Sequence, residues 1–210
     1  MILSILICSL EERKNELTIL LLNIMKQCKD FTFNGSVIDR QGDLVITTHS
    51  FEDVEIITAM DNRNFTTGHK RNILYQMAKG KHSVSVDDDD SVPNYYVEEL
   101  LKAAKEDKDC FAINGSITFN GKDEKKWYIS KDLKYETVGI GKDMYYNRYP
   151  NHITPIRSEI TKQFLFPDKT LFEDYEWATK IHNSGLIKTE TKIEKPMYYY
   201  KYSTKTLINV

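Results

Sequence analysis

Cysteine, proline and glycine are all scarce in this sequence: its 210 residues include three cysteines, five prolines and nine glycines. Cys8, Cys28 and Cys110 are an odd number at unrelated spacings, and no CxxC pair occurs. This pattern indicates neither a disulfide framework nor a zinc site. It fits a protein of a reducing compartment, and we therefore expect a cytoplasmic location.

Long hydrophobic runs and an excess of charge of one sign are also missing. The apolar stretch from Met1 to Leu10 lacks a basic flank and runs directly into Glu11 and Glu12, so it is too short to cross a bilayer. The net charge is −2, which gives no basic field of the kind that binds nucleic acid. We therefore expect no transmembrane segment and no nucleic-acid partner.

The sequence does contain enough apolar and aromatic residues for a sizeable core. Hydrophobic residues make up 40% of the chain and aromatic residues 11%. A chain of this length forms one large domain or two small ones. We predict a single domain over residues 1–210, with a change of character near residue 115.

The first half, about residues 1–115, alternates apolar runs with amphipathic segments. The runs Ile2 to Cys8 and Val54 to Met60 are typical of strands buried on both faces. Apolar residues at helical spacing follow each run, beginning near Ser9 and near Gly68. A further strand is expected to end at Val86, which gives the spacing of a βαβ unit. These features predict an α/β fold with a Rossmann-like, mostly parallel central sheet flanked by helices.

The second half, about residues 116–210, has more alternating and aromatic residues, which predicts a smaller antiparallel portion. Asn120-Gly121 is typical of a hairpin turn. Weak periodicity predicts a loop with one minor strand over residues 29–53 and a mobile loop over residues 131–146. A helix is expected at about residues 157–164. The tail from Tyr198 to Tyr202 could form an edge strand or an aromatic platform for a sugar.

Four consecutive carboxylates, Asp87 to Asp90, follow the strand that ends at Val86. Adjacent carboxylates repel one another, so the cluster is cheap only where a cation or solvent neutralises it. Oxygen ligands suit Mg²⁺, Mn²⁺ or Ca²⁺. The residues alone leave two interpretations open, a metal site and a solvated acidic turn.

Two other features are typical of a binding site in an open α/β sheet. Asp61 ends the second strand, at the edge where such sheets bind their ligands. The next helix begins Gly68-His69-Lys70-Arg71-Asn72, and its free N–H groups and two cations predict a site for a phosphate or another anion. Far downstream, Glu173-Asp174 stands at a predicted helix start, where the local sequence by itself favours helix-dipole capping.

In this order, the motifs resemble those of the inverting family 2 glycosyltransferases, which have the GT-A fold. The resemblance covers about residues 2–200. Gly68 to Asn72 resembles the family's Gly…Arg-Asn helix start, Asp87 to Asp90 its DxD motif, and Glu173-Asp174 its Glu-Asp motif. The first turn departs from the family, because Cys8-Ser9-Leu10-Glu11 replaces Pro-x-(Tyr/Phe)-Asn.

The resemblance implies a metal-dependent enzyme that moves a sugar from a nucleotide-diphosphate sugar, by family frequency a UDP-sugar, to a hydroxyl of a glycan or another acceptor with inversion. It implies Asp174 as the general base and Glu173 as the residue that orients the acceptor. Mn²⁺ or Mg²⁺ is expected at Asp89 first, with Asp87 and Asp90 as further ligands, and the working pair is either Asp87-x-Asp89 or Asp88-x-Asp90.

The same resemblance implies the donor site and the acceptor side. The residues expected to contact the nucleotide sugar are Ser9, Glu11, Arg13, Asp61, Gly68, Lys70, Arg71, Asn72, Asp87 and Asp88. Trp127 and residues 149–154 either line the acceptor or metal side or belong to the core. Whether the chain is one module of a larger glycan-assembly enzyme stays open.

Two other functional classes share some of these features. A nucleotidyltransferase that makes nucleotide sugars also has an acidic strand end, but it normally carries a Gly-rich loop after the first strand, and Ser9-Leu10-Glu11-Glu12 contains no glycine. A non-catalytic carbohydrate-binding or Ca²⁺-binding module explains the Asp run and the tyrosines. It gives no role to the helix start at Gly68 or to Asp174.

Overall fold

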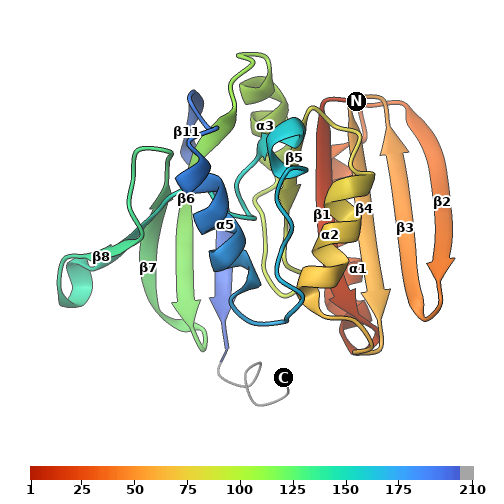
Figure 1. Cartoon of the computed structure of the whole chain (residues 1–210), viewed down its shortest axis with the longest axis horizontal. Helices are drawn as coiled ribbons and strands as arrows, with labels where there is room; N and C mark the ends of the chain where they lie inside the picture. The colour runs from red at the N-terminus through yellow and green to blue at the C-terminus, as the bar shows by residue number, and fades with distance from the viewer. Residues whose placement is uncertain (204–210) are drawn as a thin grey trace.

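The computed structural model describes residues 1–203, which form a mixed β-sheet with helices on both faces (Figure 1). The strands are β1 (Leu3–Leu10), β2 (Phe33–Gln41), β3 (Leu44–Phe51), β4 (Val54–Asp61), β5 (His82–Ser85), β6 (Cys110–Phe119), β7 (Lys122–Ile129), β8 (Glu136–Val138), β9 (Tyr145–Arg148), β10 (Ile156–Arg157) and β11 (Glu190–Tyr202). The helices are α1 (Lys14–Gln27), α2 (Thr67–Met77), α3 (Tyr96–Ala104), α4 (Ser158–Thr161) and α5 (Glu173–Ser184), with short 3₁₀ turns η1 (Glu11–Arg13) and η2 (Gly141–Asp143). The strand order is β2-β3-β4-β1-β5-β10-β6-β7-β9-β8, and β11 also pairs with β6.

The centre of the first half is parallel, as the apolar runs predict. Strand β1 pairs in parallel with β4 on one side and with β5 on the other. Helix α1 leads from β1 to the β2–β3 pair, and helix α2 makes the crossover from β4 to β5. The carboxyl ends of the three parallel strands therefore lie at the same edge of the sheet, which is where the acidic run begins.

Alternate side chains of β1 enter two separate cores, one on each face of the sheet. Leu3, Ile5 and Ile7 pack with residues of α1 and α3. Leu6 points the other way and packs with residues of α2 and α5, including Trp177. Figure 1 shows α2 and α5 in front of the sheet and α1 behind it. The continuous apolar run of β1 is explained by burial on both sides.

The sheet as a whole is mixed, and it has more antiparallel than parallel pairings, unlike the mostly parallel sheet expected. Residues 29–53 contain a complete hairpin, β2–β3, which pairs antiparallel to β4. The sequence shows only a minor strand there because the side chains of β2 are exposed or half-buried, so no alternation marks it. Gly42, with φ 62°, supplies the left-handed residue in the turn.

The second half contains the expected hairpin and two departures from expectation. Asn120-Gly121 joins β6 to β7 with positive φ at both residues, which confirms the turn. Strand β8 and the first two residues of β9 lie within residues 131–146, which the sequence predicts as a loop. Helix α4 is four residues long because the chain beyond it is tied to Asn72, whose side-chain amide bonds both the N–H and the C=O of Phe166. The tail forms β11, which runs parallel to β6, and Tyr198 is fully buried within it.

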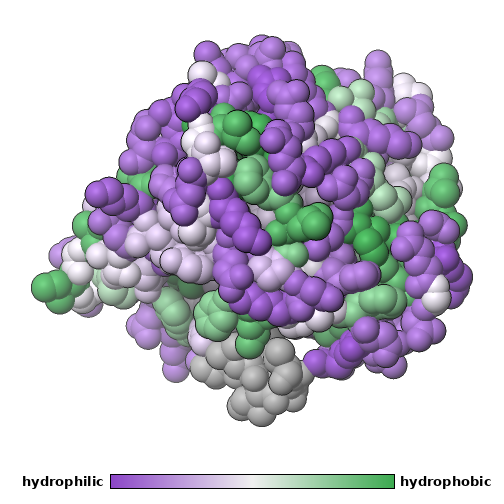
Figure 2. Space-filling model, in the orientation of Figure 1, coloured by the Kyte–Doolittle hydropathy of each residue, from purple (hydrophilic) through white to green (hydrophobic). Residues whose placement is uncertain are grey.

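The two halves share one continuous sheet. The two-residue strand β10 pairs with β5 on one side and with β6 on the other. Among residues 1–203, no helix is both long and apolar enough to span a bilayer. Figure 2 shows that the face carrying α2 and α5 is largely hydrophilic, with separate apolar groups between charged ones.

Candidate active site

The acidic run follows β5 as a tight turn, in which the N–H of Asp90 donates to Asp87 O at 3.2 Å. Asp88 and Asp90 are buried, with 4% and 5% of their surface exposed, whereas Asp87 and Asp89 are half-buried. The buried carboxylates, Asp88 and Asp90, both accept hydrogen bonds from other parts of the protein. Ser9 Oγ donates to Asp88 Oδ2 at 2.7 Å, and Tyr198 Oη donates to Asp90 Oδ2 at 2.7 Å. Asp87 and Asp89 are thus the two carboxylates of the run that stay partly exposed.

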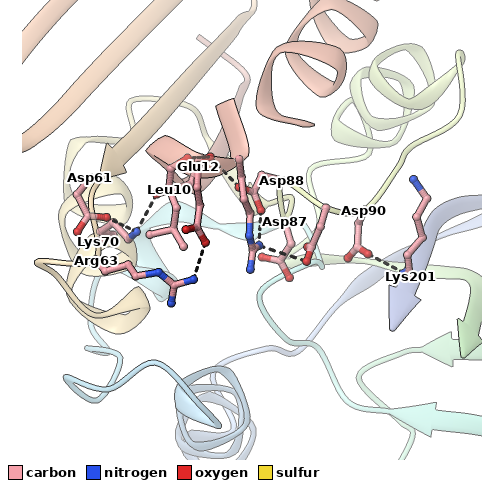
Figure 3. Close-up of polar contacts among 12 residues, drawn as sticks. Leu10, Glu12, Asp61, Arg63, Lys70, Asp87, Asp88, Asp90 and Lys201 are labelled. Atoms are coloured by element: carbon pink, nitrogen blue, oxygen red, sulfur yellow. Dashed lines mark hydrogen bonds and ion pairs between the residues drawn. The ribbon is translucent and has the colours of Figure 1, made fainter. Parts of the chain in front are cut away.

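Asp88 and Asp90 also tie the acidic run to two other segments of the chain. Arg13 Nη1 donates to Asp88 Oδ1 at 2.8 Å and approaches Asp89 Oδ2 at 3.2 Å. The backbone N–H of Lys201 donates to Asp90 Oδ1 at 2.7 Å, a contact visible in Figure 3. Burial raises the pKa of Asp90 well above its usual value, and the charge of Asp87 adds to the rise. With both oxygens of Asp90 occupied, its side chain ties the site to β11.

Asp89 is the half-buried carboxylate of this run whose ionised form the surrounding protein disfavours. Burial raises the pKa of Asp89 to about 6, and the charges of Asp87 and Asp88 add to the rise while Arg13 opposes it. Among residues 1–203, no three His, Cys, Asp or Glu side chains gather closely enough to hold a metal ion by themselves. Mg²⁺ and Mn²⁺ are commonly bound by one or two carboxylates together with substrate phosphates. The residues present fit such a site, with Asp89 and Asp87 as its protein ligands.

Arg71 connects the acidic run to α5. It projects from α2, is 3% exposed, and donates through Nη2 to Asp87 Oδ1 at 2.8 Å and through Nη1 to Glu173 Oε1 at 2.5 Å. Burial opposes the charge of Arg71, but Asp87, Glu173 and Asp174 together hold its pKa above the usual value. The guanidinium thus joins two motifs that lie far apart in the sequence.

His152 makes a second connection between the same two regions, and the sequence gives no individual signal for it beyond its place in residues 149–154. Its Nε2 lies 3.2 Å from Asp87 Oδ2, and its Nδ1 lies 3.3 Å from Asp174 Oδ2. Burial and Arg71 oppose protonation, but Asp87 and Asp174 prevail and raise the pKa of His152 to about 9.

The two carboxylates at the start of α5 have different environments. Glu173 is buried, and burial raises the pKa of its carboxyl despite the nearby Arg71. The side chain of Asp174 is 35% exposed. Burial would raise the pKa of Asp174, but His152 and Arg71 lower it to about 2. Asp174 is therefore ionised at neutral pH and reaches the surface, as a proton acceptor requires.

The helix start at Gly68 is packed against another part of the chain, contrary to the predicted anion site. The N–H of Gly68 donates to Lys169 O at 3.0 Å, and the N–H of His69 donates to Thr66 Oγ1. A Cβ at position 68 would lie 1.9 Å from Pro167 O, so glycine is needed for this close approach. The backbone groups that could bind a phosphate are thus already occupied by protein.

The cations of that helix and Asp61 are also engaged internally. Lys70 Nζ donates to Asp61 Oδ1 at 2.6 Å and to Ser9 O at 2.8 Å, and all three residues are buried (Figure 3). Asp61 Oδ2 accepts from the N–H of Phe65 at 2.8 Å. This buried pair holds the carboxyl ends of β1 and β4 together. Because both side chains are buried, Asp61 and Lys70 support the site from the protein interior.

The remaining predicted residues lie on either side of this centre. Glu11 is exposed and lines a surface hollow of about 300 Å³ with Asn62 and Asn64. Asn72 holds the segment that leads to α5, as described above. Trp127 is 6% exposed and packs edge-on against Tyr198, so it belongs to the core. The structure therefore gathers Ser9, Arg13, Arg71, Asp87, Asp88, Asp89, Glu173 and Asp174 into one connected cluster and places Glu11 at its margin.

Comparisons with known proteins find a similar fold among solved structures. No protein-family model matches the chain, and no curated protein matches it significantly. The structure of S. aureus TarS 1–349 in complex with UDP-GlcNAc aligns with 96% of this chain and 59% of the TarS chain, at a TM-score of 0.61 and 14% identity. The complex of TarS 1–349 with UDP aligns with 100% of this chain and 63% of that one, again at 0.61 and 14%. The chain thus shares its fold with TarS 1–349 and spans about three fifths of its length.

Proposed function

We propose that this protein is a glycosyltransferase of the GT-A fold that transfers a sugar from a UDP-sugar to an acceptor hydroxyl with inversion, using Mn²⁺ or Mg²⁺. The observation that carries the proposal is the meeting of Asp87 and Asp89 with Glu173 and Asp174 through Arg71 and His152. The similar fold of TarS 1–349, which was solved with UDP-GlcNAc and with UDP, supports a nucleotide-sugar donor.

The donor side of the mechanism rests on Asp89 and Asp87. A divalent cation held by these carboxylates and by the diphosphate would stabilise the negative charge that develops on the leaving nucleotide. Arg71 and Arg13 fix the positions of the two carboxylates from opposite sides. Asp88 accepts hydrogen bonds from both Ser9 and Arg13, and these bonds keep the turn after β1 against the acidic run.

The acceptor side rests on Asp174. As the acceptor oxygen forms its bond to the anomeric carbon, the bond from that carbon to the diphosphate oxygen breaks, and the hydroxyl proton passes to the Asp174 carboxylate. Attack on the face opposite the leaving nucleotide gives inversion. The lowered pKa of Asp174 keeps the base ionised in the free enzyme. Glu173, held by Arg71, is proposed to orient the acceptor.

The test is incubation of the protein with a panel of nucleotide sugars and Mn²⁺ or Mg²⁺, followed by chromatography of the nucleotides. We expect slow release of UDP from a UDP-sugar through transfer to water, and loss of that activity in Asp174→Asn. In a parallel incubation with added pyrophosphate, a nucleotidyltransferase would instead convert the UDP-sugar to UTP and a sugar 1-phosphate. A non-catalytic carbohydrate-binding or Ca²⁺-binding module would leave every nucleotide sugar intact. Either of these outcomes would contradict the proposal.

A further inference from the structure

The side chain of His152 lies between two carboxylates that come from different parts of the site. Its imidazole is 7% exposed as part of a buried residue, with Nε2 3.2 Å from Asp87 Oδ2 and Nδ1 3.3 Å from Asp174 Oδ2. Asp87 stands at the end of β5 on the proposed donor side, and Asp174 stands at the start of α5 on the proposed acceptor side. One ring therefore touches both sides.

The backbone around His152 holds this ring in place. The carbonyl of His152 accepts from the N–H of Ser85 in β5 at 2.8 Å and from Tyr75 Oη in α2 at 3.3 Å. The turn that carries it is closed by the bond from the Thr154 N–H to Asn151 O at 3.0 Å. The backbone that carries the imidazole is thus held by contacts to β5 and α2 that do not depend on the carboxylates.

The bridge through His152 has a counterpart through Arg71, and together they close a ring. Asp87 Oδ1 accepts from Arg71, and Asp87 Oδ2 faces His152. Arg71 also bonds Glu173, and His152 also faces Asp174, which is the next residue in the chain. Glu173 is therefore tied to Asp87 through the Arg71 side chain, and Asp174 through the His152 side chain.

We propose that His152 is a positioning residue that fixes the Asp174 carboxylate through Nδ1 and couples its orientation, through Nε2 and Asp87, to the donor side. This inference rests on the proposed function. One oxygen of Asp174 faces the imidazole, and the side chain is 35% exposed, so its carboxyl also reaches the surface. Small errors in the placement of a reacting group cost rate far more than they cost binding.

The chain offers a matched control in His82, a second buried histidine outside the site. His82 is fully buried at the start of β5, and its Nε2 bonds the backbone carbonyl of Lys108 at 2.8 Å. Its Nδ1, like that of His152, has no well-aligned hydrogen-bond partner. A histidine that only fills space and satisfies the backbone should behave as His82 does.

Two substitutions separate the two halves of the bridge. Glutamine places an amide nitrogen near the position of Nε2, so His152→Gln keeps the contact with Asp87 and loses that with Asp174. Asparagine places its nitrogen near Nδ1, so His152→Asn does the reverse. The probes are UDP with Mn²⁺ for binding by calorimetry and UDP-GlcNAc for hydrolysis, in which water takes the place of the acceptor hydroxyl.

We expect His152→Gln to bind UDP about as tightly as the wild type and to hydrolyse saturating UDP-GlcNAc roughly 100-fold more slowly. We expect His152→Asn to weaken UDP binding with a smaller loss of rate at saturation. His82→Gln should change neither quantity. Because His152 is proposed to act through Asp174, His152→Gln should cause no further loss of rate when it is added to Asp174→Asn.

Three results would overturn the inference. One is an active wild type whose two His152 variants match His82→Gln in both measurements. Another is a loss of rate from His152→Gln that is equally large in the presence and absence of Asp174→Asn. A wild type that neither binds UDP nor hydrolyses UDP-GlcNAc would overturn the proposed function and this inference with it. Thermal unfolding of each variant identifies any that fails to fold, and the other variant then carries the comparison.

Discussion

Helices α2 and α5 begin with sequences that suggest opposite roles, and in the structure distant parts of the chain engage both starts. The start of α2, with Gly68 and two cations, suggests an anion site, but its N–H groups are occupied by Lys169 O and Thr66 Oγ1. The start of α5, with Glu173 and Asp174, suggests helix-dipole capping, and both carboxylates do lie in its first turn. In the fold they also face Arg71 and His152.

The difference shows that a charged helix start is defined by what the rest of the chain brings to it. The segment that covers the start of α2 contains Pro167 and Lys169, about a hundred residues further along the chain. The same segment leads directly into α5. One segment of the chain therefore covers the start of α2 and also places the start of α5 next to the acidic run.

The largest effect is expected from Asp174→Asn. The amide keeps the shape and the contact with His152 but cannot accept a proton, so turnover of UDP-GlcNAc should fall by about 10² to 10⁴. UDP affinity and melting temperature should stay close to wild type. Glu176→Gln is the matched control, since Glu176 is exposed on the same helix and pairs with Lys169. Similar rates in both variants would make the α5 carboxylates structural.

Arg71→Ala should lower stability strongly, since it leaves Glu173 and Asp87 without their buried cation. Loss of one partner from such a group costs about 3 to 5 kcal/mol of unfolding free energy. Urea denaturation measures it. Arg63→Ala removes an exposed ion pair with Glu12 and should cost less than about 1 kcal/mol. If the two variants were equally stable, Arg71 would not be the link between α2 and α5.

Gly68→Ala tests whether the start of α2 is a packing contact. The added methyl group would meet Pro167 O, and the forced shift should cost about 1 to 3 kcal/mol of unfolding free energy. UDP affinity of the folded protein should change little. Gln76→Ala, on the exposed side of the same helix, serves as the control. A stable variant with abolished UDP binding would restore the anion site.

The smallest effect is expected from pH in metal-free buffer. The raised pKa of His152, about 9 in the folded protein, means that its pairing with Asp87 and Asp174 stabilises the fold fully below about pH 6.5 and is lost as pH rises through 9. Arg71 stays charged and keeps most of the network. The unfolding free energy should fall over this pH range in the wild type and equally in His82→Gln. Burial lowers the pKa of His82 in the wild type, so His82 is neutral throughout this range and does not contribute to the fall. A fall of the same size in His152→Gln would assign the effect to another group.

The parallel centre and the acidic run could be predicted because their signals are local. Buried strands β1 and β4 appear as nearly continuous apolar runs, and Asp87 to Asp90 follow closely after the end of β5. The hairpin β2–β3 could not be seen, because exposed side chains on β2 leave no periodic pattern. The role of His152 could not be seen either, since both of its partners lie elsewhere in the sequence. Tyr198, which bonds Asp90 from β11, was similarly hidden in an aromatic tail.

The central claim, that Asp87 and Asp89 form a donor site completed by a metal and the diphosphate, is tested most directly by calorimetric titration with UDP. We expect measurable binding with Mn²⁺, much weaker binding after chelation with EDTA, and the same loss in Asp89→Ala with Mn²⁺ present. Asp30→Ala, which removes an exposed carboxylate just beyond the end of α1, should bind UDP as the wild type does. Equal affinity with and without metal, or unchanged affinity in Asp89→Ala, would contradict the account.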